Sequence, residues 1–249
     1  MPNAPEEDGP GRRAADRGRY GRLSRERVLA SAMTLVDREG LSGLSMRSLG
    51  AELGVEAMAL YRYASSKDAL LDGLVEAFHQ ELEEVLAGSG PVEAAWQDEL
   101  RRRARASYEV AMRHPNIVPL LATRLLSTPL ARRPAAVLRS DEGVLDLLRR
   151  AGAAEPVAVS LHRAFTAWLL GYLLVELRAM DDAPEETDPG FRLGLHRLPA
   201  HEFPRLRATA PALAGRGGVE GLTAGLDALL ERFGSRPGEL DDDQGPPAS

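Results

Sequence analysis

The residues from Ser45 to Tyr63 combine the types that place one helix firmly across another. Gly54 separates two short segments of helical apolar spacing, and glycine supplies the positive φ that a tight turn between helices requires. Gly50 is small enough for a close helix crossing, at a cost of up to about 1 kcal/mol in helix propensity relative to alanine. The apolar wedge that fixes the second helix is formed by Leu49, Leu53, Val55 and Leu60. This spacing predicts a helix-turn-helix with helices over 45–53 and 57–63.

Positive charge is concentrated around this motif. The whole chain of 249 residues carries a net charge of −6, but residues 11–67 hold ten arginines and one lysine against six acidic residues. That lysine, Lys67, is the only one in the chain and lies in the first turn of a helix predicted over 65–87. Free backbone N–H groups and the helix dipole favour a phosphate at such an end, and a lysine adds a point charge. The pattern indicates a DNA backbone contact.

Three short segments resemble one known DNA-binding domain. Leu53-Gly54-Val55, Leu60-Tyr61-Arg62-Tyr63 and Ser66-Lys67-Asp68 with Leu70-Leu71 are similar to the helix-turn-helix domain of the tetracycline-repressor (TetR) family, over about residues 24–78. The resemblance implies that Ser45 and Arg47 touch operator DNA from the first helix, and that Tyr61 and Lys67 hold phosphates. It implies that the major groove is faced by Ala57, Met58, Ala59, Arg62 and Tyr63.

The start of the predicted recognition helix departs from that family. Where the family often has polar residues, this chain has Ala57, Met58 and Ala59. Direct readout by these positions would rest on apolar contacts such as thymine methyl groups. Arg62 and Arg47 are then the candidate readers of guanine, because arginine pairs with the guanine edge in the major groove.

The remaining pattern is helical throughout, with apolar residues at three- and four-residue spacing. Further helices are expected over 24–40, 92–113, 116–126, 135–151, 156–180 and 219–233, and no segment shows a strand pattern. Residues 181–201 are predicted to be a long mobile loop. The expected fold is all-α: a basic disordered arm (1–22), a three-helix DNA-binding domain (23–70), a helical effector-binding and dimerisation domain (71–233) and a disordered tail (234–249). The arm either contacts DNA or stays solvated.

The segment 156–180 is apolar on more than one side, which favours cover by a second chain. With the narrower stripe of 219–233 it predicts a homodimer built on a four-helix bundle, as in the TetR family. The segment around Phe203-Pro204 resembles the C-terminal domain of that family. The candidate effector-pocket residues, each more simply explained as plain core, are Met112, Leu121, Leu125, His162, Phe165 and Trp168.

Several function classes are excluded or disfavoured. The chain has no cysteine, and it shows no phosphate-binding glycine loop, nucleophile elbow or paired-histidine metal helix. We therefore expect no enzyme activity, no cofactor and no metal site. No secretory signal and no continuous apolar run of membrane-spanning length is evident, so a cytoplasmic protein without a membrane partner is expected.

Together these features predict a ligand-responsive transcriptional regulator, most simply a repressor released from a palindromic operator by a small-molecule effector. The alternative from the residues is a helical architectural or partner-binding protein without operator specificity. The two differ in whether binding depends on DNA sequence.

Overall fold

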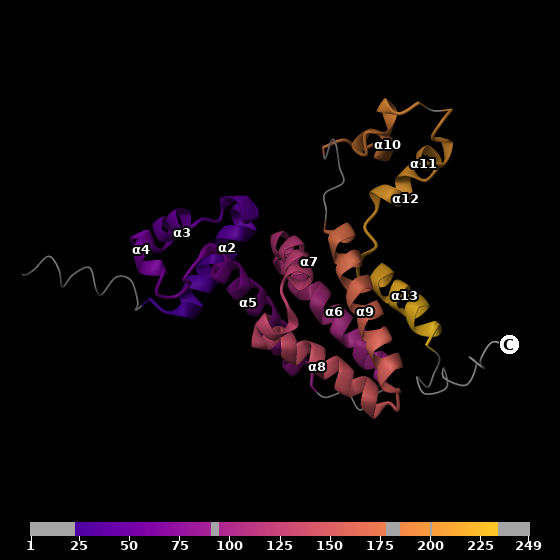
Figure 1. Cartoon of the computed structure of the whole chain (residues 1–249). Helices are drawn as coiled ribbons and strands as arrows, with labels where there is room; N and C mark the ends of the chain where they lie inside the picture. Colours follow the sequence, from indigo (N-terminus) through magenta and orange to yellow (C-terminus); the bar gives the residue numbers. More distant parts are fainter. Residues whose placement is uncertain (1–22, 91–94, 178–184, 200, 234–249) are drawn as a thin grey trace, which may run out of the picture. The chain divides into compact units, whose positions relative to one another are not determined.

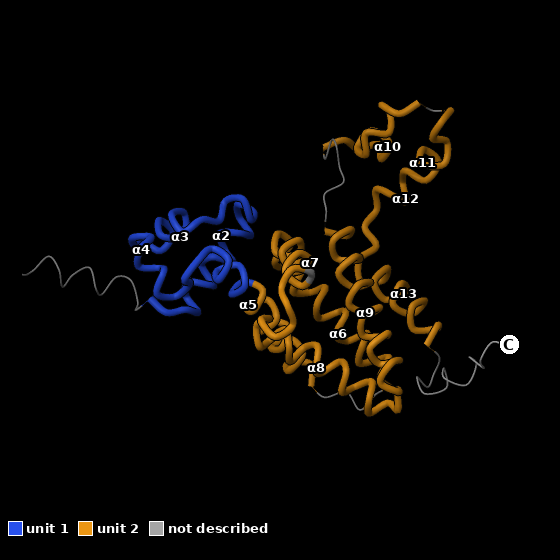
Figure 2. Tube along the Cα trace, viewed as in Figure 1, with its two compact units in different colours: residues 1–74 blue, residues 75–249 orange. Residues whose placement is uncertain are grey.

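The computed structural model describes residues 23–90, 95–177, 185–199 and 201–233, and all regular structure in these ranges is helical (Figure 1). The chain divides into two compact units after Leu74 (Figure 2). The predicted arm and tail lie outside the described residues. The predicted all-α class is confirmed; the predicted functional boundary at residue 70 stays a prediction.

The first unit packs three helices and the start of a fourth. These are α2 (Arg25–Gly43), α3 (Met46–Leu53), α4 (Ala57–Leu60) and α5 (Lys67–Gly88), which continues into the second unit. Ser24 caps α2 by accepting a hydrogen bond from the Arg27 amide at 3.2 Å, and the helix kinks at Gly40, where φ is 73°. The fully buried side chains include Leu35, Leu49, Leu60 and Leu70. One apolar core therefore holds α2, α3, α4 and α5 together.

The second unit is a bundle of longer helices. Its members are α6 (Trp96–Arg113), α7 (Val118–Ser127), α8 (Ala135–Arg150), α9 (Glu155–Glu176) and α13 (Gly218–Glu231), with short 3-10 turns at Pro115–Ile117 and Leu130–Arg132. Its core includes the fully buried Leu100, Ile117, Leu148, Leu161 and Leu222. The predicted helices are recovered to within a few residues at their ends; residues 91–94 and 178–180 lie outside the described ranges.

The predicted loop over 181–201 is wrong for its described part. Residues Pro189–Arg192 form α10, Leu195–Arg197 form a 3-10 turn, and α11 (Pro204–Ala208) and α12 (Ala210–Ala214) follow. The Asp188 side chain caps α10 by accepting from the Phe191 amide at 3.0 Å, and Phe191 stacks on His196 with ring centroids 4.6 Å apart. An aspartate cap before Pro189 is a local helix-start signal, and it accounts for α10 within the segment predicted to be a loop.

Helix α9 is apolar but incompletely covered by its own chain. Among the described helices it is the one whose length and mean hydropathy of 1.3 match a membrane span, with 22% of that window buried. Polar residues interrupt α9, so it contains no uninterrupted apolar run of membrane-spanning length, and its high mean hydropathy was therefore not expected from the sequence. Its face toward α13 is packed closely: a Cβ on Gly225 would lie 3.1 Å from the Trp168 ring. Val175 nevertheless remains 63% exposed. This leaves an apolar face of α9 available to a partner.

Candidate DNA-binding surface and ligand cavity

The turn between α3 and α4 has the geometry that the glycines predict. Gly54 adopts the left-handed conformation, with φ 66°, and ends α3. The Val55 amide donates to the Gly50 carbonyl at 2.9 Å, which brings α4 against α3. A Cβ built on Gly50 would lie 2.8 Å from the Val55 carbonyl oxygen. Glycine is thus required by contact with backbone, and even alanine would force the two helices apart.

Helix α4 is shorter than predicted. It ends at Leu60 instead of Tyr63, and the Tyr63 and Ala64 amides both donate to the Leu60 carbonyl in a closing turn. The Tyr63 hydroxyl donates to the Leu23 carbonyl at 2.9 Å. This contact fastens Leu23, next to the Ser24 cap of α2, to the turn that follows α4, so the Tyr63 hydroxyl hydrogen is already used within the protein.

The other predicted DNA contacts are largely open to solvent. Met58 is 76% and Tyr61 45% exposed, while Ala57 and Ala59 are half-buried. Ser45 is exposed, but its hydroxyl accepts from the Ser48 amide at 3.0 Å in a capping box, so it holds the start of α3. Whether these side chains touch DNA stays a prediction. The structure places all of them on the first unit and shows that Ser45 also caps α3.

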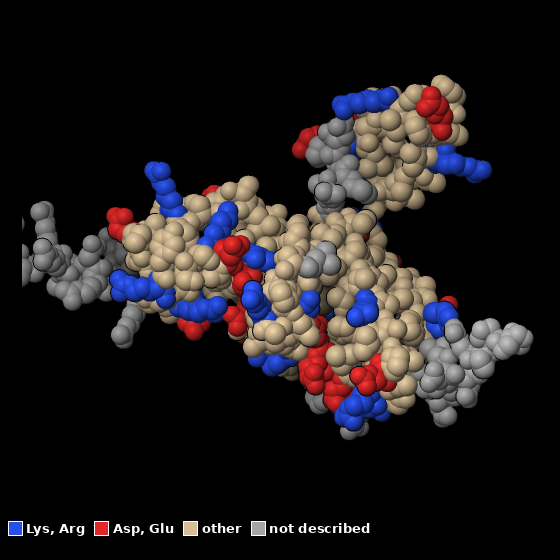
Figure 3. Space-filling model, in the orientation of Figure 1, with Lys and Arg blue, Asp and Glu red and all other residues tan. Residues whose placement is uncertain are grey.

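The three predicted cationic contacts are exposed and free. Within the described part of the chain, Arg47, Arg62 and Lys67 make no ion pair or hydrogen bond, whereas Arg38 is paired with Glu52 at 2.8 Å. Figure 3 shows blue Lys and Arg side chains over the visible face of this unit. Unpaired cations at the surface of a helix-turn-helix suit an anionic partner such as a phosphate backbone.

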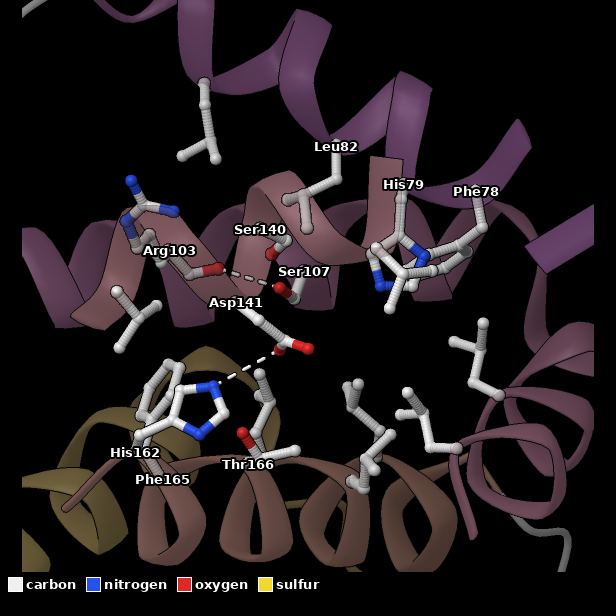
Figure 4. Close-up of a pocket in the computed structure, with 18 residues that line it drawn as sticks. Phe78, His79, Leu82, Arg103, Ser107, Ser140, Asp141, His162, Phe165 and Thr166 are labelled. Atoms are coloured by element: carbon white, nitrogen blue, oxygen red, sulfur yellow. Dashed lines mark hydrogen bonds and ion pairs between the residues drawn. The ribbon is translucent and has the colours of Figure 1, made fainter. Parts of the chain in front are cut away.

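A cavity lies inside the second unit, enclosed by five helices (Figure 4). It contains about 80 Å³ that the centre of a water molecule can reach, within a total free space of about 720 Å³ that includes its mouth. Its walls are mostly apolar, with Phe78 from α5 and Phe165 from α9. A mostly apolar cavity with a few polar groups is typical of small-molecule sites.

The polar groups of the cavity come from four helices. His79 belongs to α5, Arg103 and Ser107 to α6, Ser140 and Asp141 to α8, and His162 and Thr166 to α9. Asp141 and His162 point toward each other, with Asp141 Oδ1 3.2 Å from His162 Nε2 (Figure 4). The second Asp141 oxygen lies 3.5 Å from Arg133 Nη1. The carboxylate is therefore shared between two basic side chains.

Four of the six predicted effector-pocket residues line this cavity: Leu121, Leu125, His162 and Phe165. Met112 is 43% exposed and Trp168 packs against α13 and Tyr172, so neither is brought to it. His79 and Asp141 also line the cavity and were not predicted from the sequence. Asp141 shares a helical face with Val137, Val144 and Leu148. A charged residue on an otherwise apolar face is a sequence signal that could have identified it as a candidate pocket residue.

His79 is held as a neutral acceptor. Burial lowers the pKa of His79, and this outweighs the opposing effects of the Val75 carbonyl and the charges of Asp141 and Glu83. Its Nδ1 lies 2.9 Å from the Val75 carbonyl oxygen, which only accepts, so Nδ1 carries the hydrogen. The Nε2 lone pair is left without a partner among the described residues.

This depressed pKa predicts acid sensitivity. The unfolded histidine binds a proton below about pH 6.5 while folded His79 does not, so the free energy of unfolding should fall as pH drops from 6.5 toward the folded pKa. The slope contributed is up to about 1.4 kcal/mol per pH unit. Denaturant unfolding at several pH values should show His79→Phe with a flatter profile than the parent. The exposed His201→Phe serves as control, and an unchanged slope in His79→Phe would contradict the assignment.

Comparison with known proteins agrees with this architecture. Residues 28–74 match the family described as bacterial regulatory proteins, tetR family, and residues 90–231 match the tetracyclin repressor-like C-terminal domain. The chain is 34% identical over 160 residues to the HTH-type transcriptional repressor DrrR1 of Streptomyces coeruleorubidus. That match covers 64% of this chain and 56% of DrrR1, little more than half of the relative's length.

Two solved structures share the fold across most of the chain. A possible TetR family transcriptional regulator from Streptomyces coelicolor A3(2) has a TM-score of 0.67 and 27% identity, covering 84% of this chain and 100% of that one. The Streptomyces coelicolor TetR family protein ActR in complex with actinorhodin has a TM-score of 0.61 and 25% identity, covering 84% and 98%. Since the C-terminal domain match alone extends over more than half of the sequence, this chain belongs to the tetracycline-repressor family.

Proposed function

We propose that this chain is a homodimeric, ligand-responsive regulator that binds a palindromic operator and is released from it by a small-molecule effector. The observation that carries the proposal is a set of three exposed cations with no ion pair among the described residues. Arg47 and Arg62 lie on a helix-turn-helix whose geometry requires Gly50 and Gly54, and Lys67 begins the next helix. One such motif makes few base contacts, and two of them about 34 Å apart read a palindrome.

In the proposed dimer, residues 156–180 and 219–233 of one chain pack against the same residues of a second chain. Of these ranges, residues 178–180 lie outside the described part of the structure. Support comes from the uncovered apolar face of α9 and from Val219 at the start of α13, which is 44% exposed. A four-helix bundle between chains would bury these side chains. Light scattering during size-exclusion chromatography measures the expected dimer mass. A protein that binds operator DNA would act in the cytoplasm, and that location is part of the proposal.

The proposed release uses α5. This helix starts at Lys67 and also carries Phe78, His79, Leu82 and Leu86, which line the cavity. Lys67 and His79 are about 18 Å apart along the axis at 1.5 Å per residue. A ligand that shifts the cavity-lining turns of α5 would displace its first turn as well, and so weaken phosphate binding.

Operator recognition is tested by selecting bound duplexes from a random library with the full-length protein, followed by affinity measurements on the selected site. The expected result is a site with two inverted half-sites about one helical turn apart. Enrichment of no sequence would instead favour the alternative, a non-specific architectural protein. The relatives are transcriptional regulators, and no enzyme activity is proposed.

Two substitutions separate phosphate binding from base reading. Lys67→Ala should weaken binding to the operator and to random duplex alike, by about tenfold, and should reduce the salt dependence of binding. Arg62→Ala should lower the ratio of operator to random affinity by about tenfold or more, because a lost guanine contact costs about 1–3 kcal/mol. Fluorescence anisotropy at two salt concentrations measures both effects.

Arg105→Ala is the matched control, since Arg105 is exposed and unpaired among the described residues of the second unit. It removes one positive charge without touching the helix-turn-helix, and both affinities should change little. Equal losses on the two duplexes from Arg62→Ala would remove its base-reading role.

A further inference from the structure

The ligand cavity has apolar walls with aromatic rings on two sides. Phe78 on α5 and Phe165 on α9 are both buried, and the leucine and valine side chains of α5, α7, α8 and α9 fill most of the rest of the lining. Contact with such walls favours a ligand whose body is apolar, and the two rings suit a planar aromatic body.

The charged groups at the cavity are already paired within the protein. Asp141 is contacted by His162 and Arg133, at 3.2 and 3.5 Å. Arg103 donates to Glu99 at 3.0 Å, and Glu99 is only 13% exposed. Burial raises the pKa of Glu99, but the hydrogen bonds and charges of Arg102 and Arg103 outweigh it and hold that pKa below its usual range. Arg103 and Asp141 thus each already contact an opposite charge, although Glu99 is shared by two arginines, and a charged ligand would lose hydration and have to compete with these pairs.

One fixed acceptor of the cavity is Nε2 of His79. Its Nδ1–H is committed to the Val75 carbonyl, and Nε2 has no partner among the described residues. The Ser107 hydroxyl donates to the Arg103 carbonyl at 2.9 Å, so it too offers only lone pairs. The Ser140 and Thr166 hydroxyls can rotate and either donate or accept. An acceptor that lines the cavity is well satisfied by a ligand O–H, and a bound ligand without one would cover it and leave it unpaired.

We infer that the effector is an uncharged molecule with an aromatic body and a hydroxyl group, phenolic or alcoholic, that donates a hydrogen bond to His79 Nε2. The inference rests on the proposed function, because it names the ligand class of the same cavity. Asp141 and His162 enter from α8 and α9, while His79 enters from α5 (Figure 4). A ligand bonded to His79 therefore contacts directly the helix that carries Lys67.

The test uses four two-ring probes of the same shape: 1-naphthol, 1-methoxynaphthalene, 1-naphthoate and 1-naphthylmethylammonium. Binding to the full-length dimer is measured by titration calorimetry at pH 8 without DNA. The expected result is that 1-naphthol binds about tenfold more tightly than its methyl ether, since the ether cannot donate to His79. Both charged probes should bind at least about tenfold more weakly than 1-naphthol.

His79→Phe keeps a ring in place and removes the acceptor, so the ratio of the 1-naphthol and 1-methoxynaphthalene affinities should fall to about one. The control His201→Phe changes a histidine side chain that is 83% exposed and should leave the ratio unchanged. Equal binding of the phenol and the ether to the parent protein, preference for a charged probe, no binding by any probe, or a ratio that survives in His79→Phe would each overturn the inference.

The comparison of four probes on the parent protein needs no variant, so it stands even where His79→Phe fails to fold. Failure of the proposed function is separately visible: loss of operator selection would overturn that proposal while leaving the probe preference intact. Intact operator binding with no hydroxyl preference would overturn only the ligand class.

Discussion

Gly50→Val is expected to destabilise the helix-turn-helix by about 3 kcal/mol and to abolish operator binding at ordinary protein concentrations. The added Cβ would lie 2.8 Å from the Val55 carbonyl oxygen and 3.3 Å from the Ala57 amide nitrogen. Both neighbours are backbone, so no side-chain rotation relieves the clash, and α4 must move away from α3. Gly50→Ala should lose less stability than Gly50→Val but still be less stable than the parent protein. Alanine gains about 1 kcal/mol in helix propensity, which partly offsets the same overlap of its Cβ.

Gly88→Val is the matched control, since a Cβ on Gly88 meets nothing within 4 Å. Thermal unfolding followed by circular dichroism, together with anisotropy on the selected operator, measures both effects. Unchanged unfolding temperature and affinity in Gly50→Val would show that the close approach of α3 and α4 is not needed for the DNA-binding form.

The helix-turn-helix was predictable because its signals are local. Gly54, the Ser45 cap and the spacing of Leu49, Leu53 and Leu60 all act within a few residues of one another, and α3 and its turn follow them closely. The expected reason for Gly50, by contrast, was incomplete. Sequence showed a small residue at a crossing, and only the structure shows that the crossing partner is a carbonyl oxygen.

Features set by distant residues were not predictable in the same way. Local periodicity extended α4 to Tyr63, but the Tyr63 hydroxyl is bonded to the carbonyl of Leu23, forty residues away. The cavity likewise depends on tertiary placement. His79, Asp141 and His162 lie far apart in sequence, on α5, α8 and α9. The residue pattern of a single helix does not predict that these three helices come together around one cavity. Trp168 and Met112 failed to reach the cavity for the same reason.

Glu176 illustrates this limit most clearly, because its partners lie on another helix and no local pattern around it indicates a role. Its carboxylate accepts hydrogen bonds from the Gly217 amide at 3.1 Å and the Gly218 amide at 2.8 Å. These amides open α13, whose preceding residue offers no side-chain cap. The Tyr172 hydroxyl donates to the Gly218 carbonyl at 2.6 Å beside them. A glutamate at the end of α9 thus caps the start of α13 from 41 residues away.

Glu176→Ala is therefore expected to lower the free energy of unfolding by about 3 kcal/mol, because two part-buried amides lose a charged acceptor near a helix N-terminus. Glu176→Gln retains one acceptor oxygen and should lose about half as much. Glu176 is only 9% exposed, and it is held at a contact between the two helices proposed to form the dimer interface. The dimer dissociation constant should rise in parallel with the loss of stability.

Glu231→Ala, at the other end of α13, removes an exposed carboxylate where the helix dipole disfavours negative charge, and stability should stay the same or rise slightly. Denaturant unfolding and concentration-dependent light scattering distinguish the three variants. Because the cap joins α9 to α13 within one chain, Glu176→Ala should loosen α13 before the dimer separates, and amide hydrogen exchange should quicken first around Gly218. Exchange that stays slow there, with stability equal to that of Glu231→Ala, would mean that packing of Trp168 against Gly225 holds α13 in place without its cap.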